Sequence, residues 1–372
     1  QMPESALGVS ASGPLTLVFR LNSADENFLS KLTLPGAMPC DEEFFNSTRG
    51  TYGLTAKTTL SSGPFYLYNW TSGGLFLRRE PSGTLIDSLR LVQNTNNADQ
   101  SAVELVNGEK CSAALDDTGS TTSLSSISYS DTTWALLFNC NTLFSSTELR
   151  QSLAGVAREA AVVPSTGLFA AADGLIPDGL NVDGMNYRST VGDVSPAAVD
   201  VRALYLSARQ GMANSDFNKV TLMIPAGSGL TEAAETINGA WQKELSLFFS
   251  IEEVDEETFQ KRLSEGDYTI ALAPISAESG SVYSMLAQFT TAGGNLTGYA
   301  NALYATQLEA STHATGAARC RLLGECERQL LSDCVAVPLF SQQKRLLVAS
   351  GIKGLIFDPF GPVLDLTYTT KE

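Results

Sequence analysis

The stretch Gly266-Asp267-Tyr268-Thr269-Ile270-Ala271-Leu272-Ala273 closes a segment, residues 221–275, in which strand patterns alternate with helix patterns. Short apolar runs of strand length are separated by longer runs in which apolar residues recur every three or four positions. This alternation repeats a strand, helix, strand unit twice, which is typical of parallel strands covered by helices. The ends of such strands form a crevice in which ligands bind. The segment predicts strands at 221–224, 246–254 and 268–275, with helices at 232–245 and 256–264.

Local signals define the ends of both helices. Thr231 and Asp255 are predicted N-caps, because their side chains can accept hydrogen bonds from the free N–H groups of a first turn. Phe259 and Leu263 stand four positions apart and share one face of the second helix. Gly266 is expected to end that helix.

Turn-rich stretches organise the rest of the chain. Residues 1–125 contain hairpin material punctuated by Gly, Ser and Pro. An amphipathic helix is predicted at 149–161, and a long irregular stretch follows over 162–201. The predicted strands outside the central segment lie at 14–21, 63–70, 74–78, 345–348 and 364–367.

Four motifs resemble the family 5 extracellular solute-binding proteins, which are peptide, nickel and oligosaccharide receptors of ABC importers. The helix and turn of residues 259–272 are similar to the family's "GDY" unit. The other three occur in the family's order over nearly the whole chain: 62–70 is similar to its "GPY…W" hairpin, 136–153 to its "FN … VRQAL" crossover, and 335–340 to its "PLY" strand.

The resemblance implies an α/β fold of the two-lobed, type II periplasmic-binding-protein type with mixed sheets, which closes around its ligand at a hinge. It assigns residues 1–125 to part of the first lobe, 126–340 to the second lobe and 341–372 to a return to the first lobe. Residues 6–34 resemble a part that follows a long N-terminal segment in relatives. An N-terminally truncated chain with an incomplete first lobe is therefore expected, with Gln1 as an artificial or cleaved start.

Composition excludes some classes of partner. The chain has 372 residues, 43% of them apolar, and a formal net charge of −16. A nucleic-acid partner is not expected, because phosphate binding requires clustered Lys and Arg. No apolar run reaches the roughly 18 residues of a membrane span. The family implies an extracytoplasmic location, as a cell-surface lipoprotein or in a periplasm, although no anchor is visible in this chain.

The six cysteines and the single histidine favour neither a metal site nor a cofactor. No Cys-x-x-Cys pair occurs, and His313 lies in a polar stretch where an exposed position beside a helix is expected. Cys320 and Cys326 fall on a predicted helix, 316–331, and six residues along a helix rise about 9 Å and face different sides. They are expected not to form a disulfide. The sequence leaves open the alternative of a disulfide between distant segments that involves Cys111, Cys140 or Cys334.

Catalytic constellations are also lacking, so an enzyme is not expected. No nucleophile stands beside a base, and Gly227-Ser228-Gly229 lacks the Gly-Lys-Ser/Thr ending of a phosphate loop. This glycine pair is interpreted as a tight turn.

The resemblance also names candidate ligand-binding residues. In relatives, the strand equivalent to residues 271–278 runs beside the bound peptide, and an acidic residue faces the peptide's amine. Glu278 stands at or next to that acidic position, although it is equally compatible with a solvated loop residue. Tyr299 and Asn301 correspond to a "GYxNP" stretch near the cleft floor, or they form a turn that bonds its own backbone. The full set of candidates is Ala273, Pro274, Ile275, Ser276, Glu278, Tyr299, Asn301, Trp134 and Phe340.

The sequence therefore predicts an extracytoplasmic receptor of an ABC importer that binds a peptide or another small solute and delivers it to a membrane permease. Two alternatives with the same fold or location stay open: a peptide-signal sensor and an extracellular hydrolase or transferase. A structural surface domain is a third alternative.

Overall fold

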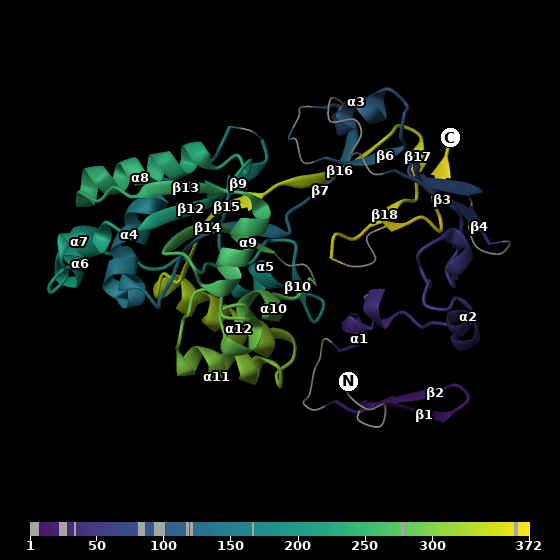
Figure 1. Cartoon of the computed structure of the whole chain (residues 1–372), viewed down its shortest axis with the longest axis horizontal. Coiled ribbons are helices and arrows are strands. Elements are labelled where there is room, and N and C mark those ends of the chain that lie inside the picture. The colour runs from purple at the N-terminus through teal and green to yellow at the C-terminus, as the bar shows by residue number, and fades with distance from the viewer. Residues whose placement is uncertain are drawn as a thin grey trace.

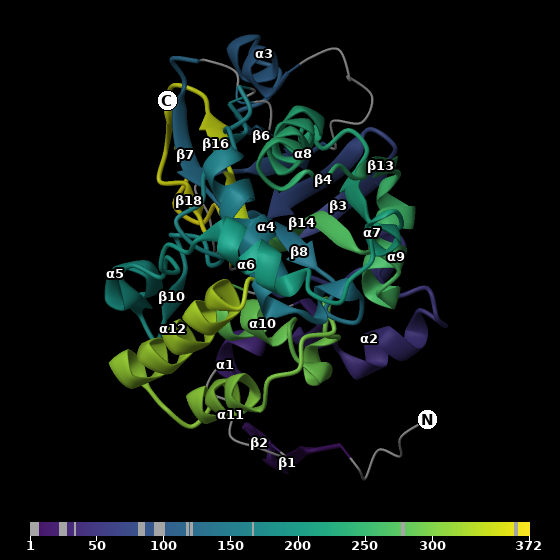
Figure 2. The same cartoon turned by 90° about the vertical axis from the view of Figure 1, so that its left-hand side faces the viewer.

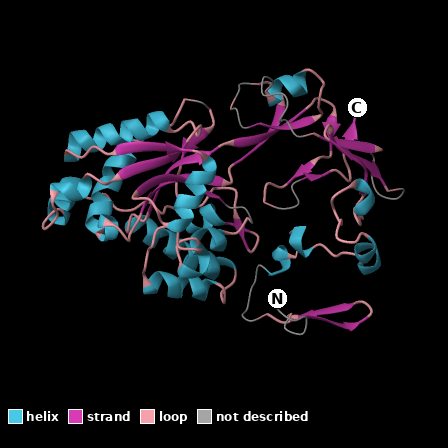
Figure 3. Ribbon diagram, in the orientation of Figure 1, coloured by secondary structure: helices cyan, strands magenta, loops and turns pink. Residues whose placement is uncertain are grey.

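The computed structural model of the chain describes residues 7–21, 28–32, 35–80, 86–92, 101–116, 119, 122–165, 167–276, 280–360 and 364–372. Its elements form two groups along the long axis of the molecule (Figure 1). One group contains a large sheet and most of the helices, and the other contains short strands from both ends of the chain (Figure 3). Strands β7 (Ser125–Tyr129) and β16 (Lys344–Val348) lie where the two groups meet.

The large sheet has six strands in the order β13-β12-β14-β8-β15-β9. Strand β12 pairs in parallel with β13 and with β14, which confirms the parallel arrangement predicted for residues 221–275. Strand β8 then pairs antiparallel with both β14 and β15, and β15 pairs antiparallel with β9, so the sheet is mixed. The strands are β8 Thr132–Phe138, β9 Phe169–Ala171, β12 Thr221–Pro225, β13 Ser250–Val254, β14 Ile270–Ser276 and β15 Ala336–Gln342.

The two crossover helices have different caps. Helix α9 (Glu256–Glu265) begins at Asp255, whose side chain accepts from Thr258 N, and ends at Gly266 in the left-handed region, as predicted. Helix α8 (Thr231–Leu245) begins after Leu230, and no side chain caps it. The predicted Thr231 cap is wrong, because the Thr231 hydroxyl instead donates to Glu253 Oε1 at 3.0 Å.

Each face of the sheet is covered by helices, because strand residues alternate between two apolar clusters. Trp134, Leu136 and Phe138 of β8 belong to the cluster beneath α4, α6 and α8. Ala135 and Leu137 belong to the cluster beneath α9, α10, α11 and α12. In the view of Figure 2, α4 and α6 lie above α11 and α12. The other helices are α4 Thr147–Ala160, α5 Tyr187–Val191, α6 Val201–Ala208, α7 Asn214–Phe217, α10 Val282–Ala287, α11 Ala302–Ser311 and α12 Gly316–Ser332. Short 3-10 turns lie at Leu143–Ser145 and Thr291–Gly293.

The stretch predicted to be irregular, 162–201, is ordered by one buried carboxylate. Glu327 of α12 is fully buried and accepts from Leu175 N at 2.8 Å and Ile176 N at 3.1 Å. It also accepts from Tyr187 Oη at 2.9 Å and pairs with Arg188 Nη2 at 2.8 Å. Burial and the neighbouring Glu327 raise the pKa of Tyr187 well above its usual range. These bonds fix the β10 (Asn181–Val182) and β11 (Met185–Asn186) hairpin and α5 against α12.

The second group of elements has a smaller core. Strands β6 (Ala113–Asp116), β16 and β7 form a three-stranded antiparallel sheet, which joins residues 344–348 to residues 113–129. Helix α3 (Ala102–Asn107) covers one face of it, where Ala102, Val106 and Leu347 form a buried cluster. Four two-residue strands complete the C-terminal part: β17 Ile352–Lys353, β18 Ile356–Phe357, β19 Leu364–Asp365 and β20 Thr370–Lys371.

None of the described residues between 7 and 92 is buried. Strands β1 (Val9–Gly13) and β2 (Thr16–Phe19) form a hairpin that lies at the lower periphery of both views (Figures 1 and 2). The remaining elements are α1 Phe28–Lys31, η2 Pro35–Ala37, α2 Glu42–Ser47, η3 Ala56–Thr58, β3 Phe65–Thr71, β4 Gly74–Arg79 and β5 Ser88–Leu91, the last three of which form an antiparallel sheet.

Candidate functional site

The candidate site lies at the end of the large sheet where β14 finishes. Ser276, the last residue of β14, pairs with Thr132, the first residue of β8. Ser341 of β15 pairs with Thr133 on the other side of β8. Antiparallel pairing therefore brings the carboxyl ends of β14 and β15 to the same end of the sheet as the start of β8. The connections from β7 to β8 and from β15 to β16 also leave the sheet at this end. Figure 1 shows β7 and β16 departing from this end.

Five of the predicted site residues lie in the last part of β14 or directly beside it on β8. Ala273 and Ile275 are fully buried beneath the α10–α12 side of the sheet. Pro274 and Ser276 are half-buried, and Pro274 pairs with Trp134. Among these four residues of β14, Ser276 carries the polar side chain.

Trp134 and Phe340 belong to the core. Trp134 packs edge-on against Phe169 with ring centres 6.4 Å apart, and Phe169 in turn contacts Phe340 at 6.1 Å. The Trp134 indole N–H donates to Gln342 Oε1 at 3.2 Å. Phe340 borders a hollow of about 300 Å³ at the β9 edge of the sheet, with Arg158, Asp173 and Ser195 among its lining residues. These contacts give both aromatic rings a packing role.

A polar cluster joins the two connections at this end of the sheet. The Asp131 carboxylate lies 2.8 Å from Lys344 Nζ, and Ser130 Oγ lies 2.7 Å from Ser341 Oγ. Thr132 Oγ1 donates to Asp131 Oδ1 at 2.8 Å and lies 3.1 Å from Ser276 Oγ. Sequence reasoning missed Asp131 and Lys344, because no local motif marks them. The pair forms because β7 and β16 are neighbours in the sheet, with Tyr129 opposite Lys344 and Asp131 two residues further along the chain.

Tyr299 and Asn301 lie at the opposite end of the sheet. The Asn139 amide, next to the end of β8, donates to Gly266 O and Tyr268 O, both at 2.9 Å, at the start of β14. Cys140 N donates to Thr297 O at 2.8 Å, which holds the 295–301 loop at this same end. Because β14 rises about 3.3 Å per residue over seven residues, this end is roughly 20 Å from Ser276. The structure therefore does not bring Tyr299 and Asn301 together with the β14 residues.

Hydrogen bonds within the protein occupy both side chains of that loop. Tyr299 Oη donates to Asp333 Oδ2 at 2.5 Å and accepts from the Asn301 amide at 2.8 Å. Asn301 Oδ1 accepts from Tyr304 N at 3.1 Å and so caps α11. Burial, and then the hydrogen bond to Asp333, raise the pKa of Tyr299. Both side chains are thus hydrogen-bonded within the protein, and a role of either toward a ligand stays a prediction. A hollow of about 510 Å³ lies at this end, lined by Thr142, Leu143, Ser215, Asp216, Lys219 and Thr269.

Glu278, the candidate carboxylate for a ligand amine, lies outside the described residues, as does Ala277. The described strand ends at Ser276, two residues before it. The assignment of Glu278 stays a prediction.

The described residues hold no group of three or more His, Cys, Asp or Glu side chains able to bind a metal ion. All six cysteines are free thiols, so Cys320 and Cys326 are unbridged as predicted, and no distant bridge is formed. Both of those thiols are buried and belong to the same apolar cluster. His313 is exposed, with Nε2 3.9 Å from Glu309, and the glycines of the 227–229 turn have positive φ, as expected of a tight turn. Across the parts of the chain that the structure describes, no helix is both long and apolar enough to cross a membrane.

The helix-covered mixed sheet, joined at one end by two connections to a second group of elements, is a two-lobed α/β architecture. A family model described as bacterial extracellular solute-binding proteins, family 5 Middle, matches residues 2–297. The chain belongs to this family, as the sequence motifs predicted.

Solved structures share this fold. The chain is similar to an oligopeptide ABC transporter substrate-binding domain from Bacillus anthracis, with 21% identity and a TM-score of 0.70, over 100% of this chain and 76% of that one. It resembles the pheromone receptor PrgZ with 20% identity and a TM-score of 0.70, over 99% and 76% of the two chains. It also resembles peptide-bound OppA of Listeria monocytogenes, with 19% identity and a TM-score of 0.67, over 98% and 75%. No curated protein sequence matches the chain. The expected two-lobed α/β fold is confirmed.

Proposed function

We propose that this protein is the receptor of an ABC importer that binds a peptide between its lobes and passes it to a membrane permease. The family match over residues 2–297 is the observation that carries the proposal. The similar structures named above support it, since they are a pheromone receptor studied for its peptide binding, the substrate-binding domain of an oligopeptide ABC transporter and a peptide-bound OppA. An extracytoplasmic location, by a lipid anchor or within a periplasm, follows from the same proposal.

The end of β14 is the proposed contact surface for the solute. Ala273, Pro274, Ile275 and Ser276 supply backbone groups and one hydroxyl, and Glu278 supplies a carboxylate for a ligand ammonium. Trp134 and Phe340 support this strand end through packing. A charged hydrogen bond of this kind contributes about 1.5–3 kcal/mol. No catalysis is part of this proposal, because binding and release by hinge closure need no chemical step.

Native mass spectrometry of the freshly purified protein tests the proposal. An equimolar mixture of tri- to octapeptides with free termini is added, and a mixture of oligosaccharides of similar mass serves as the control. We expect adducts with peptide masses and none with sugars. Sugar adducts alone, or no adduct at micromolar concentrations of either mixture, would contradict a peptide receptor.

The similarity to PrgZ favours one second candidate, a sensor of a single peptide signal. An importer receptor is expected to retain many members of the peptide mixture, whereas a sensor is expected to retain one sequence. Sequencing of the retained peptides therefore separates the two functions.

A further inference from the structure

Two connections join the layered group to the three-stranded sheet. One runs from β7 to β8 and contains Ser130 and Asp131, and the other runs from β15 to β16, where Ser341 and Lys344 lie. Side chains of the two connections contact each other. The Lys344 ammonium lies 2.8 Å from Asp131 Oδ1 and 2.9 Å from Oδ2, so one cation bridges both oxygens of the carboxylate. The two side chains are 28% and 24% exposed, which shields the pair partly from water. Ser130 Oγ lies 2.7 Å from Ser341 Oγ. The two connections are therefore fastened to each other at the point where the two groups of elements are joined.

Asp131 also reaches toward the proposed ligand strand. Thr132 is buried, and its hydroxyl donates to Asp131 Oδ1 at 2.8 Å. Thr132 Oγ1 also lies 3.1 Å from Ser276 Oγ. A hydroxyl group has one proton to donate. Since the proton of Thr132 is directed to Asp131, the bond between the two hydroxyls is donated by Ser276. The Ser276 hydroxyl can then act toward another molecule as a hydrogen-bond acceptor, through its lone pairs.

We propose that Asp131 is a positioning residue that fastens the two connections through Lys344 and, through Thr132, sets Ser276 as a hydrogen-bond acceptor toward the solute. The second half of this proposal rests on the proposed function. A solute that places an N–H group or an ammonium at Ser276 is favoured, and one that places a carbonyl there is disfavoured. Peptide backbones and free peptide amines both carry such donors.

A charge swap separates the two roles of Asp131. In the double variant Asp131→Lys with Lys344→Asp, the ion pair between the connections can form again with its direction reversed. Lysine has no acceptor atom, so Thr132 loses the acceptor for its proton. The proton of Thr132 can then point to Ser276, whose own hydroxyl becomes a donor. The swap is thus expected to restore the first role and abolish the second.

Hydrogen exchange followed by mass spectrometry measures the first role without any solute. For Asp131→Asn and for Lys344→Met, we expect exchange to rise about tenfold in residues 126–134 and 341–348, because local opening of these segments becomes easier. In the charge swap we expect the wild-type rate to return. Lys353→Met, which removes an exposed ion pair to Glu372 in the same group of elements, is the matched control and should leave these rates unchanged. Wild-type rates in both single variants, or no recovery in the swap, would overturn the first role.

Binding of the peptide mixture measures the second role. Thr132→Val keeps the ion pair and the shape of the side chain but breaks the bonds to Asp131 and Ser276. We expect Thr132→Val and the charge swap to bind the retained peptides about tenfold more weakly, and the control Lys353→Met to bind them within about threefold of wild type. Equal affinity in Thr132→Val and wild type would overturn the acceptor role of Ser276. Failure of the wild type to bind peptides would overturn the proposed function, while the exchange result would still decide the fastening of the connections. Circular dichroism confirms folding, and if Asp131→Asn does not fold, Lys344→Met and Thr132→Val decide the two roles separately.

Discussion

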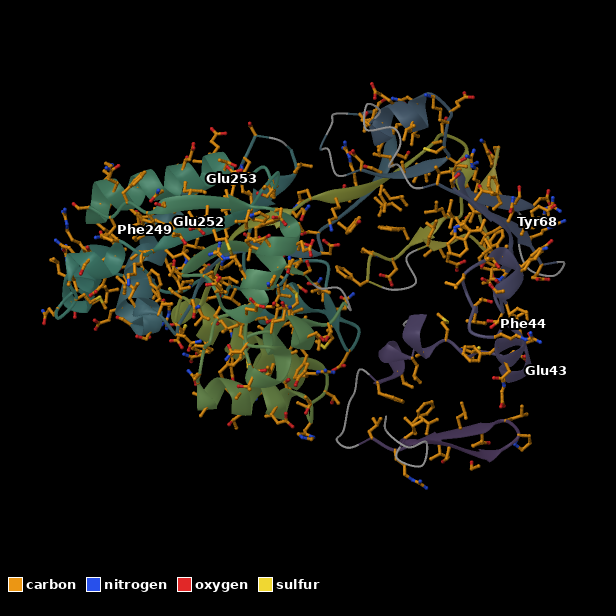
Figure 4. The ribbon with its side chains drawn as sticks, viewed as in Figure 1. Glu43, Phe44, Tyr68, Phe249, Glu252 and Glu253 are labelled. Carbon is orange, nitrogen blue, oxygen red and sulfur yellow. The ribbon has the colours of Figure 1, made fainter. Side chains whose placement is uncertain are left out.

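The layered region, residues 132–342, and the N-terminal region, residues 7–92, differ in how their apolar side chains are placed. In the layered region both faces of the six-stranded sheet are covered by helices, and the two resulting clusters contain many fully buried side chains. In the N-terminal region no described residue is buried, and Leu15 is 98% exposed. Figure 4 shows Phe249 within the layered region and Phe44 and Tyr68 at the far side of the molecule.

The difference shows that hydrophobic content alone does not decide which part of a chain forms a core. The sheet β3-β4-β5 carries Leu75, Leu91 and Trp70 along one face, yet none of these three side chains is buried by the residues that the structure describes. A sheet contributes to stability only when another layer removes its apolar face from water. Stability should therefore be concentrated in residues 132–342.

A matched pair of tryptophans tests this comparison with the largest expected effect. Trp241 is fully buried, and its indole N–H donates to Leu153 O at 2.9 Å. Trp241→Ala should lower the free energy of unfolding by about 3–5 kcal/mol. Trp70 is 48% exposed, so Trp70→Ala should lower the free energy of unfolding by less than about 0.5 kcal/mol. Urea unfolding followed by circular dichroism measures both, and similar losses in the two variants would mean that the regions do not differ in this way.

A smaller effect is expected from the buried carboxylate that orders residues 173–188. Glu327→Gln keeps the shape but leaves the Arg188 guanidinium without its buried carboxylate partner, and breaking a buried pair costs about 3 kcal/mol or somewhat more. Glu325→Gln on the same helix removes an exposed pair with Arg321 and should cost less than about 1 kcal/mol. Thermal melts of both variants check the difference. Equal melting temperatures would contradict the role of Glu327.

Thiol reactivity tests the difference between the N-terminal and layered regions without any substitution. Cys40 in the N-terminal region is exposed, whereas Cys326 is buried and its pKa is raised to about 12 by burial. Because the thiolate is the reactive form, Cys40 should be alkylated under native conditions and Cys326 only after unfolding. Iodoacetamide treatment at neutral pH, followed by peptide mass mapping, measures the two rates. Rapid native alkylation of Cys326 would show that the α11 and α12 packing opens easily.

The sequence predicted the layered region better than the connections around it. The elements between 221 and 275 were found because each has its own apolar period and its own end signal, as in Asp255 and Gly266. The Thr231 cap was wrong because Glu253, on the neighbouring strand, attracts its hydroxyl. The hairpin and helix within 162–201 were missed because the group that orders them, Glu327, lies about 140 positions away along the chain.

The candidate site was predicted in part for the same reason. The end of β14 follows directly from strand order, and Ser276 was found there. Tyr299 and Asn301 were placed near it by resemblance, but their loop is tied by Cys140 to the opposite end of the sheet. Asp131 and Lys344 could not be predicted, because they meet only through the pairing of strands more than 200 residues apart.

Hydrogen exchange of the whole chain with and without the retained peptides tests whether the solute binds at the end of β14. We expect bound peptide to slow exchange in residues 270–276 and in both connections, 126–134 and 341–348, since binding at the end of β14 closes the hinge there. We expect no change in residues 295–301 at the other end of the sheet. Slower exchange at 295–301 with no change at 270–276 would place the peptide elsewhere and contradict binding at the end of β14.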